Sequence, residues 1–216
     1  MLNIPSQILD PVNHFRSRVL GTVSLTFLLV VIFQVEVLGA HFLGYSSSYA
    51  LLNSFSREVK ILIAAMIGPF IHQGPQHLTG NLGVLIAAGS YLEYQYERRS
   101  LYIFYIATGY TAAWIPLAMG SVGSVGASGV TYGLTTWLLV HSISRVFEMV
   151  CEGTLDLRVL HVVAVIFGAV KSQEVVSIIS FIDGADDVTH FFGGLIGLFL
   201  GFKFVLDYYN ITVLSG

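Results

Sequence analysis

The feature that most constrains this chain is a succession of apolar runs, each about as long as a lipid bilayer is thick. The first run, LGTVSLTFLLVVIFQVEVLGA at residues 20–40, contains a single acidic residue. A helix needs about 20 mostly apolar residues to cross the hydrocarbon core. Charged residues make up 11% of the chain, against about 25% in soluble domains. This small number of charged residues cannot cover a water-facing surface. We therefore expect an integral, multi-pass membrane protein.

Six segments have the length and composition of membrane-spanning helices. They lie approximately at residues 19–40, 77–95, 101–119, 127–146, 157–171 and 188–207. A further apolar segment at 60–71 has about 12 residues and contains Pro69, so it should lie in the interface instead of crossing. Arg16 and Arg18 precede the first run, but that run is too long for a signal peptide and lacks an A-x-A cleavage site. We expect one membrane domain over 1–216, an all-α, six-helix bundle with an interfacial first outer loop.

The distribution of Lys and Arg predicts the orientation of this bundle. With the N-terminus inside, seven of these residues lie on the inner side and three on the outer side. Both termini are therefore predicted inside, in the cell membrane if the source is prokaryotic. The net charge of −3 gives no indication of a nucleic-acid partner. Partners should be the lipid bilayer and other membrane proteins, and the pattern indicates no particular oligomeric state.

Four reactive side chains are predicted to share one depth in the outer half of the bundle. Ser128 begins the fourth span, and His190 lies in the first turn of the sixth. His77 and Asn81 open the second span. Counted at about 1.5 Å per helical residue, all four fall in the outer leaflet. Ionisable side chains are rare within spans and are functional hypotheses by default, so we expect a water-accessible site at this depth.

Small residues along two spans predict a close helix crossing at the same depth. Gly193 and Gly197 share one face of span six with His190, because offsets of three and four residues meet on a helix. Gly129 and Gly133 repeat this spacing on span four, and small residues let helices approach closely. Taken singly, the glycines would indicate packing, the serine a helix cap and the histidine a buried structural residue. Together they predict that the serine meets the histidine.

This pairing permits nucleophilic acyl transfer. A serine hydroxyl becomes a nucleophile when a base within hydrogen-bond reach takes its proton, so Ser128 and His190 form a candidate dyad without an acidic third member. His77 and Asn81 lie at i and i+4 and, with the Ser128 backbone N–H, would donate to an oxyanion. Tyr132 would pack against the imidazole. No cofactor is indicated, and the absence of H-E-x-x-H from the sequence argues against a zinc protease.

Two polar residues near the inner side of the bundle have structural interpretations. His141 and His161 lie near the inner ends of spans four and five, where they are predicted to bond each other across the turn. Glu93 is expected to cap interactions at the inner end of span two.

These pieces together resemble the rhomboid family of intramembrane serine proteases. In the family's order they are His72-x4-His77-x3-Asn81, Gly89-x3-Glu93, Gly126-Ala127-Ser128-Gly129-x2-Tyr132-Gly133-Leu134 and His190-x2-Gly193-x3-Gly197, within residues 72–201. Each motif alone is common, but the ordered set in a six-span chain is specific. One feature departs from the family pattern. Rhomboids often carry a Trp-Arg pair in the first outer loop, and residues 41–76 contain no Trp.

The resemblance implies a role for each of these residues. Ser128 would be the nucleophile and His190 the general base, with His77 and Asn81 in the oxyanion hole. His72 would be a structural histidine that supports the first outer loop. Further supporting positions would be Tyr132, Gly126, Gly129, Gly193 and Gly197.

The resemblance also implies a gate and a substrate class. Residues 172–187 would form a mobile cap with Phe181 as a plug, and span five would be the lateral gate. Substrates would be single-span membrane proteins, cut in or near their spans without a metal or cofactor. The alternative is a catalytically silent rhomboid-fold protein that binds or escorts membrane clients. A small transporter is disfavoured because paired broken helices near the midplane are lacking.

Overall fold

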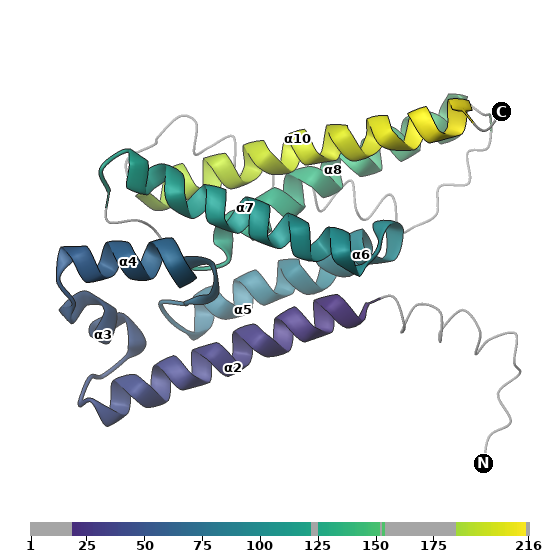
Figure 1. The fold of residues 1–216 in the computed structure, drawn as a ribbon. Coiled ribbons are helices and arrows are strands. Elements are labelled where there is room, and N and C mark those ends of the chain that lie inside the picture. The colour runs from purple at the N-terminus through teal and green to yellow at the C-terminus, as the bar shows by residue number, and fades with distance from the viewer. Residues whose placement is uncertain (1–18, 122–124, 152, 154–184, 215–216) are drawn as a thin grey trace, which may run out of the picture.

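The described part of the chain is built from helices alone. The computed structural model describes residues 19–121, 125–151, 153 and 185–214. Its four longest helices are α2 (Leu20–Phe42), α7 (Arg98–Ala118), α8 (Ser128–Cys151) and α10 (Ala185–Leu214). In Figure 1, α2 and α10 lie along opposite sides of the bundle, with α5, α6 and α7 between them. Two of the described helices, α2 and α7, combine the length and the apolar composition needed to span a membrane.

The second predicted span is one continuous helical rod with a widened centre. It consists of α5 (Pro75–Val84), the π-helical segment η2 (Leu85–Gly89) and α6 (Ser90–Tyr96). Pro75 occupies the first turn of α5, where its missing N–H leaves no bond unmade. The sequence predicted an uninterrupted helix over 77–95. π-Helical turns within α-helices frequently occur at functional sites, and this one follows directly after the turn that carries Asn81.

Short helices occupy the connection between α2 and α5, at the left end of the bundle in Figure 1. They are α3 (Ser48–Ser54), α4 (Arg57–Ile67) and the 3-10 turn η1 (Gly68–Phe70). The side chains of Ser47 and Ser56 cap the N-termini of α3 and α4. With 11 residues, α4 is too short to cross a bilayer, as its composition predicted.

Aromatic side chains of α7 hold α4 in place. The Tyr110 hydroxyl donates to the Met66 carbonyl at 2.6 Å, and the Trp114 indole N–H donates to the Ala65 carbonyl at 2.9 Å. Both carbonyls belong to the last turn of α4, where no intrahelical donor remains. At the other end of the helix, Arg57 donates to the Gly120 carbonyl at 3.0 Å. The loop that lacks a Trp of its own is therefore anchored by a Trp of α7.

Glu93 joins α6 to the start of α2. Its carboxylate is buried and accepts the backbone N–H groups of Gly21 and Thr22, both at 2.7 Å. It also accepts the Thr22 hydroxyl at 3.0 Å and pairs with Arg98 at 3.4 Å. These N–H groups belong to the first turn of α2, which has unsatisfied donors and a positive dipole end. Glu93 thus caps a different helix from the one that carries it, which corrects the role expected from the sequence.

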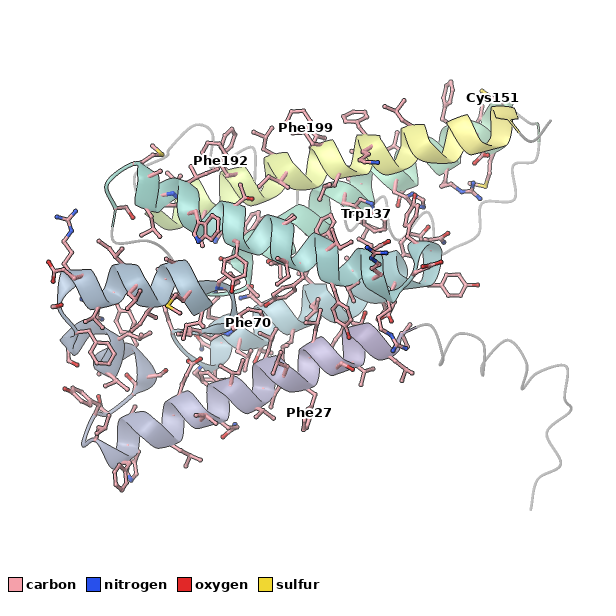
Figure 2. The ribbon with its side chains drawn as sticks, in the orientation of Figure 1. Phe27, Phe70, Trp137, Cys151, Phe192 and Phe199 are labelled. Atoms are coloured by element: carbon pink, nitrogen blue, oxygen red, sulfur yellow. The ribbon has the colours of Figure 1, made fainter. Side chains whose placement is uncertain are left out.

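Apolar side chains fill the bundle and also cover its outside. The buried core includes Leu29, Leu92, Phe104 and Trp137. Figure 2 shows Phe27 of α2 and Phe199 of α10 projecting from opposite outer sides of the molecule. These two rings are 69% and 66% exposed, which suits contact with lipid and not with water.

Candidate active site

The turn that leads into α8 places Ser128 at the helix N-terminus. Gly126 has a positive φ of 119°, a conformation that favours glycine. A Cβ atom at this position would lie 2.5 Å from Cε1 of His77, so the ring also excludes a side chain. The Gly126 N–H donates to the Gly68 carbonyl at 2.8 Å. The first glycine of the motif therefore packs the turn before Ser128 directly against His77.

His72 supports the same turn from the segment between η1 and α5. The ring is fully buried. Its Nδ1 lies 3.2 Å from the Phe70 carbonyl, and its Nε2 accepts the Ala127 N–H at 3.5 Å. These partners require the tautomer that carries its proton on Nδ1. Burial, and then the neighbouring His77, lower the pKa of His72 to about 4, so the ring is neutral at pH 7 and Nε2 remains an acceptor.

Glu36 of α2 is a second support that the sequence analysis missed. Its Oε2 accepts the backbone N–H of His72 at 3.2 Å. A carboxylate inside a predicted span was the available signal, because such residues are rare and usually have a partner. Span one is thereby connected through His72 to the turn that carries Ser128.

Glycines bring α8 and α10 into backbone contact beside the serine. A Cβ atom on Gly193 would collide with the Gly129 carbonyl oxygen, and one on Gly197 would collide with the Gly133 carbonyl oxygen. The Thr136 hydroxyl also crosses between the helices and donates to the Gly194 carbonyl at 2.7 Å. The close crossing expected from the glycine spacing is present in the fold.

The crossing sets the histidine of α10 against the tyrosine of α8. The rings of Tyr132 and His190 are stacked, with centroids 4.3 Å apart and an interplanar angle of 18°. Tyr132 is one helical turn after Ser128 and therefore lies on the same side of α8. The stacked tyrosine ring limits the orientations open to the imidazole, which lines the same cavity as Ser128.

The predicted reactive residues line one cavity of ≈ 250 Å³. Ser128, His190, His77, Asn81 and Tyr132 all line it. None of the described lining residues is acidic. Among the residues that the structure describes, no cluster of three or more His, Cys, Asp or Glu is arranged to hold a metal ion. Phe181, the rest of 172–184 and the predicted span 157–171 lie outside the described residues.

Asn81 lines this cavity and carries an unpaired donor. The side chain is buried, and its Nδ2 has no hydrogen-bond partner in the described part of the chain. Its Oδ1 lies 3.4 Å from the hydroxyl of Thr131. Buried donors are paired in most native structures, so an unpaired amide beside a serine indicates a place for a ligand oxygen. Thr131 was not identified from the sequence, because a threonine inside an apolar helix has no distinctive spacing.

His141 lies on α8, 13 residues after Ser128, and the predicted bond to His161 cannot be followed within the described residues. Its Nδ1 is 3.0 Å from the Tyr96 hydroxyl, and its ring is stacked on Trp137 with centroids 5.3 Å apart. His161 falls outside the described residues. The pairing with Tyr96 connects α6 to α8 and belongs to the packing of the bundle.

Comparisons with known proteins identify the family of this chain. The family model described as the Rhomboid domain matches residues 59–206, which include every predicted site residue. The chain is also similar to RHOMBOID-like protein 5 of Arabidopsis thaliana, with 28% identity over 142 residues. That similarity covers 63% of this chain and 42% of the Arabidopsis protein, so the chain spans less than half of that relative. Because the family model covers more than half of the chain, this protein belongs to the rhomboid family.

Proposed function

We propose that this protein is an intramembrane serine endopeptidase that cleaves single-span membrane proteins in or near their membrane segments. The observation that supports the proposal is that Ser128, His190 and Asn81 line one cavity, and that the amide nitrogen of Asn81 has no partner among the described residues. The rhomboid domain and the two membrane-capable helices are consistent with an integral membrane protein. The proposed topology has six spans with both termini inside, which puts the cavity in the outer leaflet.

The first chemical step is attack on the substrate carbonyl carbon. His190 takes the proton from the Ser128 hydroxyl as Oγ forms the new C–O bond. The carbonyl π electrons move onto oxygen and produce a tetrahedral oxyanion. The amide of Asn81, the ring of His77 and the backbone N–H of Ser128 are the donors proposed for that oxyanion. The N-terminus of α8 adds a favourable dipole end.

The second step breaks the peptide bond and releases the first product. As the tetrahedral intermediate collapses, the C–N bond breaks and the protonated His190 gives its proton to the leaving amine. A water molecule then attacks the acyl-serine ester with His190 again as base. Hydrolysis restores the Ser128 hydroxyl and releases the carboxylate product. The proton that His190 takes from water returns to Oγ of Ser128, and Tyr132 holds the imidazole plane through each of these transfers.

The supporting residues shape this site without touching the reacting atoms. His72 and Gly126 hold the turn before Ser128, while Gly129, Gly193 and Gly197 keep α8 and α10 at backbone contact. The segment 172–187 with Phe181, and span five beside it, remain the proposed cap and lateral gate.

The test is cleavage of a single-span substrate reconstituted with the protein in liposomes. Ser128→Ala and His190→Ala are each expected to abolish cleavage while the protein keeps its thermal unfolding transition. A fluorophosphonate probe should label the wild type on Ser128 and should label neither variant. Cleavage by Ser128→Ala at the wild-type rate would refute the proposal.

The second candidate function is a catalytically silent rhomboid-fold protein that binds or escorts membrane clients. It is favoured by the observation that the relative carries the name of a rhomboid-like protein. This candidate predicts that a client co-purifies with the wild type and with Ser128→Ala equally, and that the probe labels neither.

A further inference from the structure

Thr131 occupies a place in the cavity that the family motif leaves unspecified. It lies on α8 one turn after Ser128, is 5% exposed and lines the cavity. Its hydroxyl oxygen is 2.9 Å from the Ser128 carbonyl oxygen and 3.4 Å from Oδ1 of Asn81. One hydroxyl proton is therefore shared between an acceptor on its own helix and an acceptor on α5.

The Thr131 hydroxyl contacts Oδ1 of Asn81, which places Nδ2 on the other edge of the amide. The last side-chain torsion of asparagine is broad and roughly two-fold, so packing alone does not select one orientation of the amide. With Oδ1 held by Thr131, Nδ2 is directed away from that hydroxyl and has no partner among the described residues. The opposite orientation would present a carbonyl oxygen to the place where negative charge develops.

We propose that Thr131 is a positioning residue that fixes Asn81 as an oxyanion donor. The inference rests on the proposed function, because it assigns Thr131 a role in that reaction. When Nδ2 donates to the oxyanion, electron density shifts toward Oδ1 and makes it a better acceptor. Connected hydrogen bonds polarise one another in this way in a low-dielectric site. The contact from Thr131, which is long in the resting protein, is thus strengthened in the transition state.

The experiment compares Thr131→Val with Thr131→Ser in liposomes that contain a single-span substrate. Valine keeps the shape of threonine but loses the hydroxyl, so kcat should fall about 3- to 10-fold, the scale of one hydrogen bond. KM should stay within about 2-fold, because the interaction acts on the transition state. Serine restores the hydroxyl and should recover most of kcat. Thr108→Val is the matched control, since Thr108 is also buried and bonds within its own helix, to the Phe104 carbonyl of α7.

A double-mutant cycle shows whether Thr131 acts through Asn81. In an Asn81→Ala background, Thr131→Val should cause no further loss of kcat, because the amide that it positions is gone. A full additive loss in that background would overturn the proposal, as would failure of serine to restore kcat or a change confined to KM.

The outcomes separate this inference from the proposed function. If Thr131→Val folds poorly, Thr131→Ala takes its place, because alanine removes the hydroxyl without putting a methyl group where it was. The same changes in kcat and KM are expected for this variant. Loss of cleavage in Ser128→Ala with unchanged cleavage in Thr131→Val would refute the role of Thr131 alone. Persistent cleavage in Ser128→Ala would refute the proposed function itself.

Discussion

Replacement of Gly197 by alanine tests the backbone contact between α8 and α10, which is proposed to bring His190 to Ser128. An alanine Cβ at this position would lie 2.5 Å from Cα of Gly133, whereas ordinary van der Waals contact begins at 3.4 Å. The clash is with backbone, which no side-chain rotation relieves. Helix α10 must therefore retreat from α8 by at least about 0.9 Å, because the Gly133 carbonyl oxygen lies closer still to that Cβ. His190 lies two turns along the same helix and would move with it.

The expected result is a loss of activity larger than the loss of stability. A misplacement of about 1 Å at catalytic groups costs about 10²-fold in rate, so kcat of Gly197→Ala should fall by about two orders of magnitude. Overpacking of this kind lowers the free energy of unfolding by about 1–3 kcal/mol. Both quantities are measurable on one preparation, by substrate cleavage in liposomes and by thermal unfolding in detergent.

Gly39→Ala is the control for this experiment. Gly39 is inside α2, and no described atom lies within 4 Å of a Cβ built on it. Alanine there should leave cleavage unchanged and should stabilise the helix slightly, because glycine is the poorer helix former. Wild-type kcat and an unchanged unfolding temperature in Gly197→Ala would refute the reasoning that backbone contact between α8 and α10 sets the site.

Two further predictions concern the supports of the bundle. Glu93→Leu removes the acceptor of two N–H groups and a hydroxyl at the start of α2. The free energy of unfolding should therefore drop by about 3 kcal/mol or more. An unfolding temperature equal to that of the wild type would contradict this expectation. Burial lowers the pKa of His72 from its ordinary 6.5 to about 4, so the unfolded chain takes up the proton first as the pH falls. The free energy of unfolding should therefore keep its full value above about pH 6.5. It should fall by about 3 kcal/mol in total as the pH is lowered toward 4. Thermal unfolding across this range should be less pH-dependent in His72→Gln than in the wild type, and equal slopes would argue against the shift.

The helices were largely predictable because their signals are local. Five of the six predicted spans coincide with helical segments of the fold, and the sixth, 157–171, falls outside the described residues. Apolar runs and helix caps depend only on residues that lie within a few positions of one another in the sequence. The π-helical turns at 85–89 were missed, since the segment LIAAG is as apolar as a regular helix.

The residues of the candidate site were predictable for a related reason. Offsets of three and four put Ser128 with Tyr132, and His190 with Gly193, on single helix faces whatever the rest of the fold does. The supports of that site were not predictable in the same way. Glu36 meets His72 across 36 positions, and Glu93 meets Gly21 across 72. No periodicity within one helix connects such pairs.

The sequence by itself determined the class of the protein, because low charge and long apolar runs leave lipid as the only suitable solvent. It also predicted that four reactive residues share a depth, since rise per residue is fixed in a helix, and these four line one cavity of the fold. Only the tertiary structure decided how the side chains of those residues are oriented relative to one another. The stacking of Tyr132 on His190 depends on the crossing of α8 with α10, and the contact between Asn81 and the Thr131 hydroxyl depends on the packing of α5 against α8. Such contacts arise from side-chain torsions and interhelical distances, which local sequence does not encode.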